Sequence, residues 1–139
     1  MDAKESLPVP EGFRKLKNGP PAEDWVGPFY YKKSTDGLIL GFRAAPRHSN
    51  IIGTVHGGVL LFFADYAVIM TAMMGQKESC ATVSCSSDFV AGTKLGDWIE
   101  AQAEVSRRTG SLIFVTGRIY CGDKTLLNFQ SVVRRLGSK

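Results

Sequence analysis

Hydrophobic residues are densest between residues 59 and 74, where Asp65 and Thr71 are the only clearly polar side chains. This stretch predicts a helix over 56–74 that Gly75 would end, because glycine readily adopts the left-handed conformation found at helix C-termini. The helix is apolar almost all round, a pattern typical of a helix enclosed by other elements. The apolar run is shorter than the roughly 20 residues that span a bilayer and carries a central carboxylate, so we expect no membrane segment.

Alternating apolar and polar positions predict strands on both sides of this helix. Before the helix, residues 29–33 and 38–44 flank the dipeptide Asp36-Gly37, a strong hairpin signal. After the helix come four further predicted strands: 80–90, 97–108, 111–121 and 124–135. Their connections are short, which favours antiparallel neighbours. One apolar helix and about six antiparallel strands predict an α+β domain, in which a curved sheet wraps around a long central helix.

Residues 1–28 contain five of the six prolines and predict a partly irregular N-terminal extension, followed by a domain of residues 29–139. The one regular element that we expect in the extension is a short helix around 11–18. The first residues are charged and lack the apolar stretch of a secretory signal peptide, so we expect a cytoplasmic protein.

Charge and cysteine content narrow the range of partners and cofactors. The net charge is +4, and the basic doublets are scattered along the chain. They fit a solvated surface, or attraction to an anion such as nucleic acid, a membrane surface or a phosphate-bearing small molecule. Because aromatic residues are not interleaved with them, we expect no nucleic-acid partner. Three cysteines without a paired metal spacing and only two histidines predict reduced, buried thiols, no metal and no cofactor.

His56, Gly57 and Gly58 occupy the predicted N-terminus of the helix. The first amides of a helix lack intrahelical acceptors and carry the positive end of the helix dipole. Two glycines leave this backbone open, so the amides could hold an anion or a carbonyl oxygen that becomes negative during a reaction. The glycines could equally serve only to permit tight packing of the helix on the sheet.

A carboxylate at position 65 is costly in an apolar helix unless it is paired or used. Asp65 follows Gly58 by two helical turns, which separates the two by about 10 Å along the axis. Both groups can act on one carbonyl only if they come from two different chains, so a catalytic role predicts a dimer with active sites at the interface. Alternatively, Asp65 is a structural carboxylate. His56 points to the opposite side of the helix from Asp65, which excludes a His–Asp dyad within one chain.

The sequence N-x-x-G-T-V-H-G-G-V-x-x-x-x-x-D, from Asn50 to Asp65, resembles the signature of the hotdog-fold acyl-CoA thioesterases. Within the 4-hydroxybenzoyl-CoA thioesterase superfamily, the sequence is most similar to the PaaI-like group and to thioesterase superfamily member 2. The resemblance continues through K-L-G-D at 94–97 and V-S-R-R-T-G-S at 105–111 and covers residues 37–136. It implies a hotdog fold, a homodimer with a continuous sheet that often pairs into a homotetramer, and hydrolysis of an acyl-CoA thioester.

The resemblance also implies roles for individual residues. Asp65 would act as nucleophile or general base, while the amide of Gly58 or Gly57 would polarise the thioester carbonyl. The remaining implied catalytic positions are Asn50, which orients the thioester or water, His56, which steadies the loop, and Thr82, which positions water. The family more often has serine at the position of Thr82, and Ser84 is close by in the sequence. The candidates for contact with the coenzyme A phosphates are Arg107, Arg108, Thr109, Gly110 and Ser111.

Two other functions are compatible with the same fold. A hydratase or dehydratase acting on an acyl thioester would need a histidine beside a carboxylate, and His56 is its one plausible histidine. The second function is that of a non-catalytic acyl-CoA-binding module. Such domains commonly carry a DNA-binding appendage, and residues 1–28 are too short and too rich in proline to form one.

Overall fold

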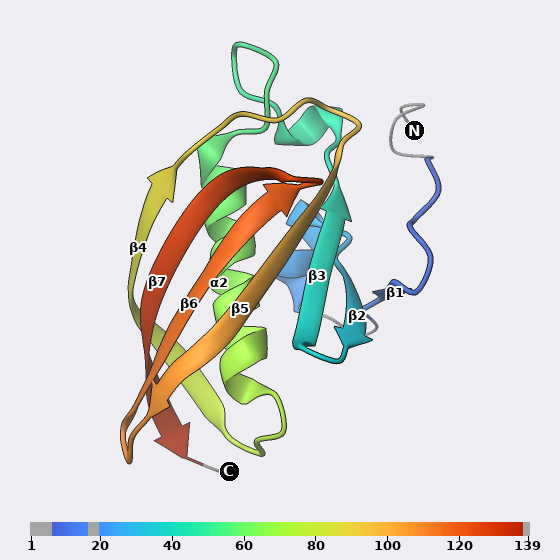
Figure 1. Cartoon of the computed structure of the whole chain (residues 1–139). Helices are drawn as coiled ribbons and strands as arrows, with labels where there is room; N and C mark the ends of the chain where they lie inside the picture. Colours follow the sequence, from blue (N-terminus) through green and yellow to red (C-terminus); the bar gives the residue numbers. More distant parts are fainter. Residues whose placement is uncertain (1–6, 17–19, 138–139) are drawn as a thin grey trace.

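The computed structural model describes residues 7–16 and 20–137 and consists of one curved antiparallel sheet around one long helix (Figure 1). The seven strands have the order β1-β2-β3-β5-β6-β7-β4. Their bounds are β1 Arg14–Lys15, β2 Tyr30–Ser34, β3 Gly37–Arg43, β4 Ser79–Phe89, β5 Trp98–Arg108, β6 Leu112–Cys121 and β7 Lys124–Gly137. The helical elements are α1 Pro21–Val26, the 3₁₀ turn η1 Pro46–His48 and α2 Gly57–Met73.

The structure confirms the predicted fold class, the helix, the hairpin and the four later strands. Helix α2 begins one residue after His56, which is its N-cap, and Gly75 follows with a positive φ of 75°. The sequence did not predict that β4 pairs with β7, rather than with a neighbour along the chain. Strand β4 thereby becomes one edge of the sheet, because no strand within the described residues pairs with its other side.

The helix predicted around 11–18 is wrong over the residues that the structure describes. Residues 11 and 12 form a turn and Arg14–Lys15 pair with Tyr30 and Tyr31, while 17 and 18 lie outside the described residues. A helix forms instead at Pro21–Val26, with proline in its first turn and two acidic residues there. Proline fits this position because the first helical N–H groups have no intrahelical acceptor.

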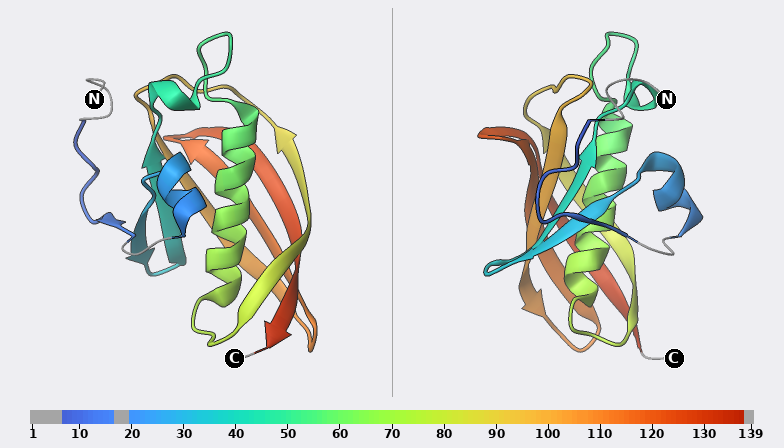
Figure 2. Two further views of the ribbon diagram at one scale, coloured as in Figure 1. Left: turned by 180° about the vertical axis from the view of Figure 1, so that it is seen from behind. Right: turned by 90° about the vertical axis from the view of Figure 1, so that its right-hand side faces the viewer.

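The core lies between the concave face of the sheet and α2, as the rear view in Figure 2 shows. Aromatic rings from the sheet and the helix meet there: Phe29, Phe42, Phe63 and Tyr66. Phe42 and Phe63 are fully buried, with ring centroids 4.8 Å apart in an edge-to-face contact. This packing fixes the rotation of α2 and so decides which residues it presents outward.

The sheet does not enclose α2 on all sides, contrary to the expectation from its apolar sequence. Gly58, Leu61 and Asp65 lie on an exposed strip of the helix, and Leu61 is 38% exposed. Beside this strip, the edge strand β4 exposes Val83 and Phe89 by 62% and 58%. Exposed apolar side chains beside an unpaired strand edge are typical of a surface that another molecule covers.

His48 is a buried polar residue that ties the chain before α2 to the N-terminal segment. Its ring is 2% exposed, and its Nδ1 accepts a hydrogen bond from the Ala45 N–H at 2.9 Å. Nε2 bonds the Val26 carbonyl, which can only accept, so the ring is neutral with its proton on Nε2. Burial lowers the pKa of His48 below 6.5, and the positive charge of Arg47 adds to this, although the Val26 carbonyl opposes it.

We expect His48 to make the protein less stable in acid. Below about pH 6.5 this ring takes up a proton in the unfolded chain but stays neutral in the folded chain. The free energy of unfolding therefore falls as the pH falls from 6.5 toward the pKa of the folded chain. Urea denaturation of the wild type and of His48→Gln between pH 5 and pH 8 measures this. The variant should be less stable by about 1–3 kcal/mol at pH 8 but should lose less stability on acidification. Equal pH slopes in the two proteins would contradict the assignment.

Candidate functional site

Asp65 lies in the middle of α2 and is exposed in the single chain, rather than buried as the sequence suggested. The Thr82 hydroxyl of β4 donates a hydrogen bond of 2.6 Å to its Oδ1. Within the described residues no hydrogen bond reaches the other carboxylate oxygen, which is open to a water molecule or substrate. Thr82 was expected to position a water molecule, and the structure places it where it orients the carboxylate.

The first turn of α2 is held by the side chain of its N-cap residue. Nδ1 of His56 accepts a hydrogen bond from the Gly58 N–H at 2.8 Å, and the His56 carbonyl accepts from the N–H of Val59. No residue that the structure describes accepts a hydrogen bond from the Gly57 N–H. Of the two glycine amides that the sequence left open as candidates, Gly57 is the one that is free to bind an incoming oxygen.

Gly57 also allows a close contact with β4. A Cβ atom at this position would lie 2.8 Å from Cε1 of Phe89, closer than real Cβ contacts, so a larger residue would displace the ring. The sequence predicts no role for Phe89 in the site. Its place in an alternating strand gave no sign that it covers the N-terminus of α2.

Asn50 organises the loop that leads into α2. Its Oδ1 accepts hydrogen bonds from the N–H groups of Ile52 and Thr54 at 3.1 and 3.0 Å, and its Nδ2 donates to the Thr54 hydroxyl at 2.8 Å. The side chain is therefore engaged within its own loop. This loop also exposes Ile51 and Ile52, by 101% and 79%.

A single chain keeps the Gly57 amide and the Asp65 carboxylate apart. The two residues are eight positions apart on one continuous helix, about 12 Å along its axis. Both must come within about 3 Å of the reacting atoms to act on one carbonyl. The two groups of one chain therefore cannot serve the same reaction centre.

The predicted coenzyme A residues lie at the end of β5 and in the turn that leads to β6, near the opposite end of α2 from Gly57 (Figure 1). Arg108 Nη2 donates to the Ala72 carbonyl at 3.0 Å and so caps the last turn of the helix. The hydroxyl of Thr109 accepts from the Leu112 N–H at 2.9 Å and closes the turn. The side chain of Arg107 is exposed, as are Gly110 and Ser111.

The thiols nearest to Asp65 are Cys80 and Cys85. Both are half-buried, and burial raises the pKa of each, with a smaller contribution from the Asp65 charge. They are therefore protonated at neutral pH and unsuited to act as thiolate nucleophiles. Within the described residues, no group of His, Cys, Asp and Glu side chains could hold a metal ion. Nor does this part of the chain contain a helix long and apolar enough to cross a membrane.

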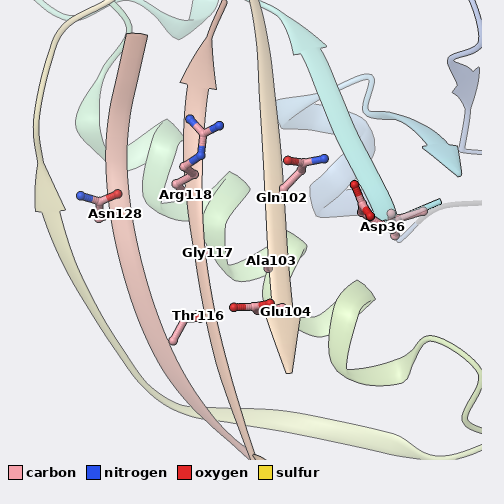
Figure 3. A pocket seen from close by; sticks show the side chains of 9 residues that line it. Asp36, Gln102, Ala103, Glu104, Thr116, Gly117, Arg118 and Asn128 are labelled. Carbon is pink, nitrogen blue, oxygen red and sulfur yellow. The ribbon is translucent and has the colours of Figure 1, made fainter. Parts of the chain in front are cut away.

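A hollow of about 420 Å³ lies on the outer face of the sheet, and Figure 3 shows its polar lining. Gln102, Arg118 and Asn128 are paired neighbours on β5, β6 and β7 and project on this side. The guanidinium of Arg118 lies 4.2 Å from the centroid of the Tyr120 ring. The sheet separates this hollow from Asp65, which lies on the inner side.

A curved antiparallel sheet wrapped around one long helix defines the hotdog fold, and a helix carboxylate with an open helix amide fits the thioester hydrolases among its members. Residues 52–128 match the family model of the thioesterase superfamily. The chain belongs to this family of thioester hydrolases.

Comparison with individual proteins agrees with this membership. The chain is similar to the Pseudomonas aeruginosa protein named "Putative esterase PA0474", with 29% identity over 89% of this chain and 95% of the relative. Its fold resembles that of E. coli PaaI, from the phenylacetic acid degradation operon, with a TM-score of 0.69, 23% identity and coverage of 73% and 74%. It also resembles a hypothetical thioesterase of Streptococcus pneumoniae, whose structure contains coenzyme A, with a TM-score of 0.72, 16% identity and coverage of 80% and 88%.

Proposed function

We propose that the protein is an acyl-CoA thioesterase, which hydrolyses an acyl- or aryl-CoA thioester to the free acid and coenzyme A. The observation that carries this proposal is the exposed Asp65 carboxylate, oriented by Thr82, on the same helix as the open Gly57 amide. The similarity to a thioesterase whose structure contains coenzyme A supports the choice of thioester.

In the proposed mechanism the Gly57 N–H and the positive end of α2 hold the thioester carbonyl oxygen. Asp65 either removes a proton from a water molecule that attacks the carbonyl carbon, or attacks that carbon itself and is released by water. The oxygen gains negative charge in either route, and the helix amide stabilises it. The carbon–sulfur bond breaks when the tetrahedral intermediate collapses, and the sulfur takes up a proton, so that coenzyme A leaves as the free thiol. In the second route this departure precedes the release of the acyl group from Asp65 by water. His56 steadies the amide by capping the first turn, and Asn50 steadies the loop before it.

We propose further that each active site is shared between two copies of the chain, in a homodimer or homotetramer. The spacing of about 12 Å between Gly57 and Asp65 requires the amide and the carboxylate at one site to come from different chains. The uncovered strip of α2 and the free edge of β4 offer a surface for the second copy, because an exposed strand edge can extend its sheet with another chain.

The side-chain contacts favour one of the candidate phosphate-binding residues and weigh against a hydratase. Arg107 is the better candidate for the coenzyme A phosphates, because it is exposed whereas Arg108 caps α2. A hydratase has less support, because Nδ1 of its one candidate histidine, His56, is occupied by the Gly58 amide.

We assign the thioesterase domain to residues 29–139, to which the preceding extension adds strand β1.

A panel of short, long and aryl CoA thioesters, followed by release of free thiol, tests the proposed activity. We expect catalysed release from at least one member of the panel. Binding of these thioesters without thiol release would instead support a non-catalytic acyl-CoA-binding module. Addition of water to an unsaturated acyl-CoA without thiol release would support a hydratase.

Replacement of Thr82 tests its role in orienting the carboxylate. We expect Thr82→Val to lower kcat by about tenfold, because the variant loses the charge-assisted hydrogen bond to Asp65 but keeps the shape of the side chain. Thr82→Ser keeps the hydroxyl and should retain most of the activity. Steady-state kinetics of the three proteins measures the effect, and equal losses in both variants would point to packing rather than to the hydrogen bond.

A further inference from the structure

The C-terminal half of α2 and strands β1 to β3 enclose a groove of about 740 Å³, away from the site described above. Its walls are apolar and half-buried, apart from the more exposed Met74: Leu16, Tyr31, Leu38, Met70, Met73 and Met74. The volume is in the range of small-molecule sites, about 300–1,000 Å³. Methionine side chains are flexible and polarisable, so they adapt to ligands of varying length.

The groove lies on a different flank of α2 from the catalytic carboxylate. Met70, Met73 and Met74 have the i, i+3, i+4 spacing that places side chains on one helix face. Asp65 is rotated by about 140° from Met70 and is hydrogen-bonded to β4. Strands β1 to β3 form the opposite end of the sheet from β4. A ligand in the groove would therefore not contact Asp65.

Positive charge lines this apolar groove on the side formed by β1 and β2. Arg14, Lys15 and Lys33 line it and are exposed. Among the described residues, the ion pair that forms joins Arg135 of β7 to Glu78, so none of the three cations is paired with a described carboxylate. An apolar groove with unpaired cations at its rim complements a molecule that has one long apolar part and one anionic end.

We infer that this groove binds a free fatty acid with a long alkyl chain, at a site separate from the catalytic one. The alkyl chain lies along Met70, Met73 and Leu16, and the carboxylate is held by Arg14 and Lys33. Arginine suits this role because its planar guanidinium binds both carboxylate oxygens. The inference does not depend on hydrolysis, because it rests on a different face of the chain.

Calorimetric titration with dodecanoate, below the concentration at which it forms micelles, tests the inference. The wild type should bind it in a saturable way and should bind dodecanamide, which lacks the charge, at least about tenfold more weakly. Arg14→Glu combined with Lys33→Glu should weaken dodecanoate binding by a similar factor. The matched control is Arg134→Glu, at an exposed basic residue of β7 that does not line the groove, and it should bind as the wild type does.

Two further variants test the apolar wall of the groove and its separation from the active site. Met73→Trp should fill the groove and weaken binding, with circular dichroism confirming the fold, while Asp65→Asn should bind dodecanoate normally. Absence of saturable binding to the wild type would overturn the inference. Binding that survives Met73→Trp and the charge reversal, or that is lost in Asp65→Asn, would also overturn it. Hydrolysis of CoA thioesters is measured separately, so failure of this site leaves the proposed activity untouched.

Discussion

Asp65→Asn should lower kcat for thioester hydrolysis by about 10²–10⁴-fold, the contribution typical of a general base. The amide keeps an oxygen that can accept the Thr82 hydrogen bond, so the variant removes the basicity of the side chain and little else. The side chain is exposed, and we therefore expect the unfolding free energy to change by less than about 1 kcal/mol. Thiol release and urea denaturation measure the two effects.

Asp88→Asn is the matched control, because Asp88 is also an exposed aspartate beside the free edge of the sheet, on β4. It should retain wild-type activity. If Asp65→Asn hydrolysed every thioester of the panel as fast as the wild type, the catalytic assignment of Asp65 would fail. Equal losses in both variants would point instead to an effect on the surface charge of β4.

Gly57→Pro should lower kcat by about 10²–10³-fold, as expected when one donor to a developing oxyanion is removed. Proline lacks the N–H, and it is well tolerated at the first position of a helix. The preceding residue, His56, has φ −60° and ψ 135°, which is the conformation that a following proline requires. The substitution should therefore delete the proposed oxyanion donor while the helix still forms.

Gly57→Ala is the control for the added bulk. It keeps the N–H but places the same Cβ atom against the ring of Phe89, which is exposed enough to move aside. We expect Gly57→Ala to retain much more activity than Gly57→Pro in steady-state kinetics, with similar circular dichroism. Equal losses would show that the contact with Phe89, rather than the amide, explains the effect.

The sequence predicted the fold well because local patterns specify most of it. Alternation located the strands, and the glycine after Met74 and the histidine before Gly57 marked the ends of α2. Local patterns do not specify which distant strands pair, so the contact between β4 and β7 was not foreseen. The prolines near residue 20 predict an irregular chain, but proline also begins helices, and one forms at Pro21–Val26.

The candidate site was predicted less completely, because its details depend on side-chain contacts. An apolar helix indicates burial, but the sequence does not say whether its own sheet or a second molecule provides the cover. The apolar pattern therefore predicts an enclosed Asp65, whereas the single chain leaves it exposed. The sequence also left Gly57 and Gly58 open as the oxyanion donor. The hydrogen bond from Gly58 to the His56 ring depends on a side-chain rotamer that no pattern of residues reveals.

In the proposed active site, one chain supplies the amide and another the carboxylate. The sharing of the site is tested by mixing equal amounts of Asp65→Asn and Gly57→Pro, each nearly inactive alone, and by unfolding and refolding them together. A dimer of the two variants would have one site with both residues intact. Random pairing makes about half of the dimers mixed, so we expect about one quarter of the wild-type rate of thiol release. Different tags on the two chains allow the presence of mixed dimers to be verified. If mixed dimers form but the rate is no higher than the average of the two variants refolded separately, the shared site is contradicted.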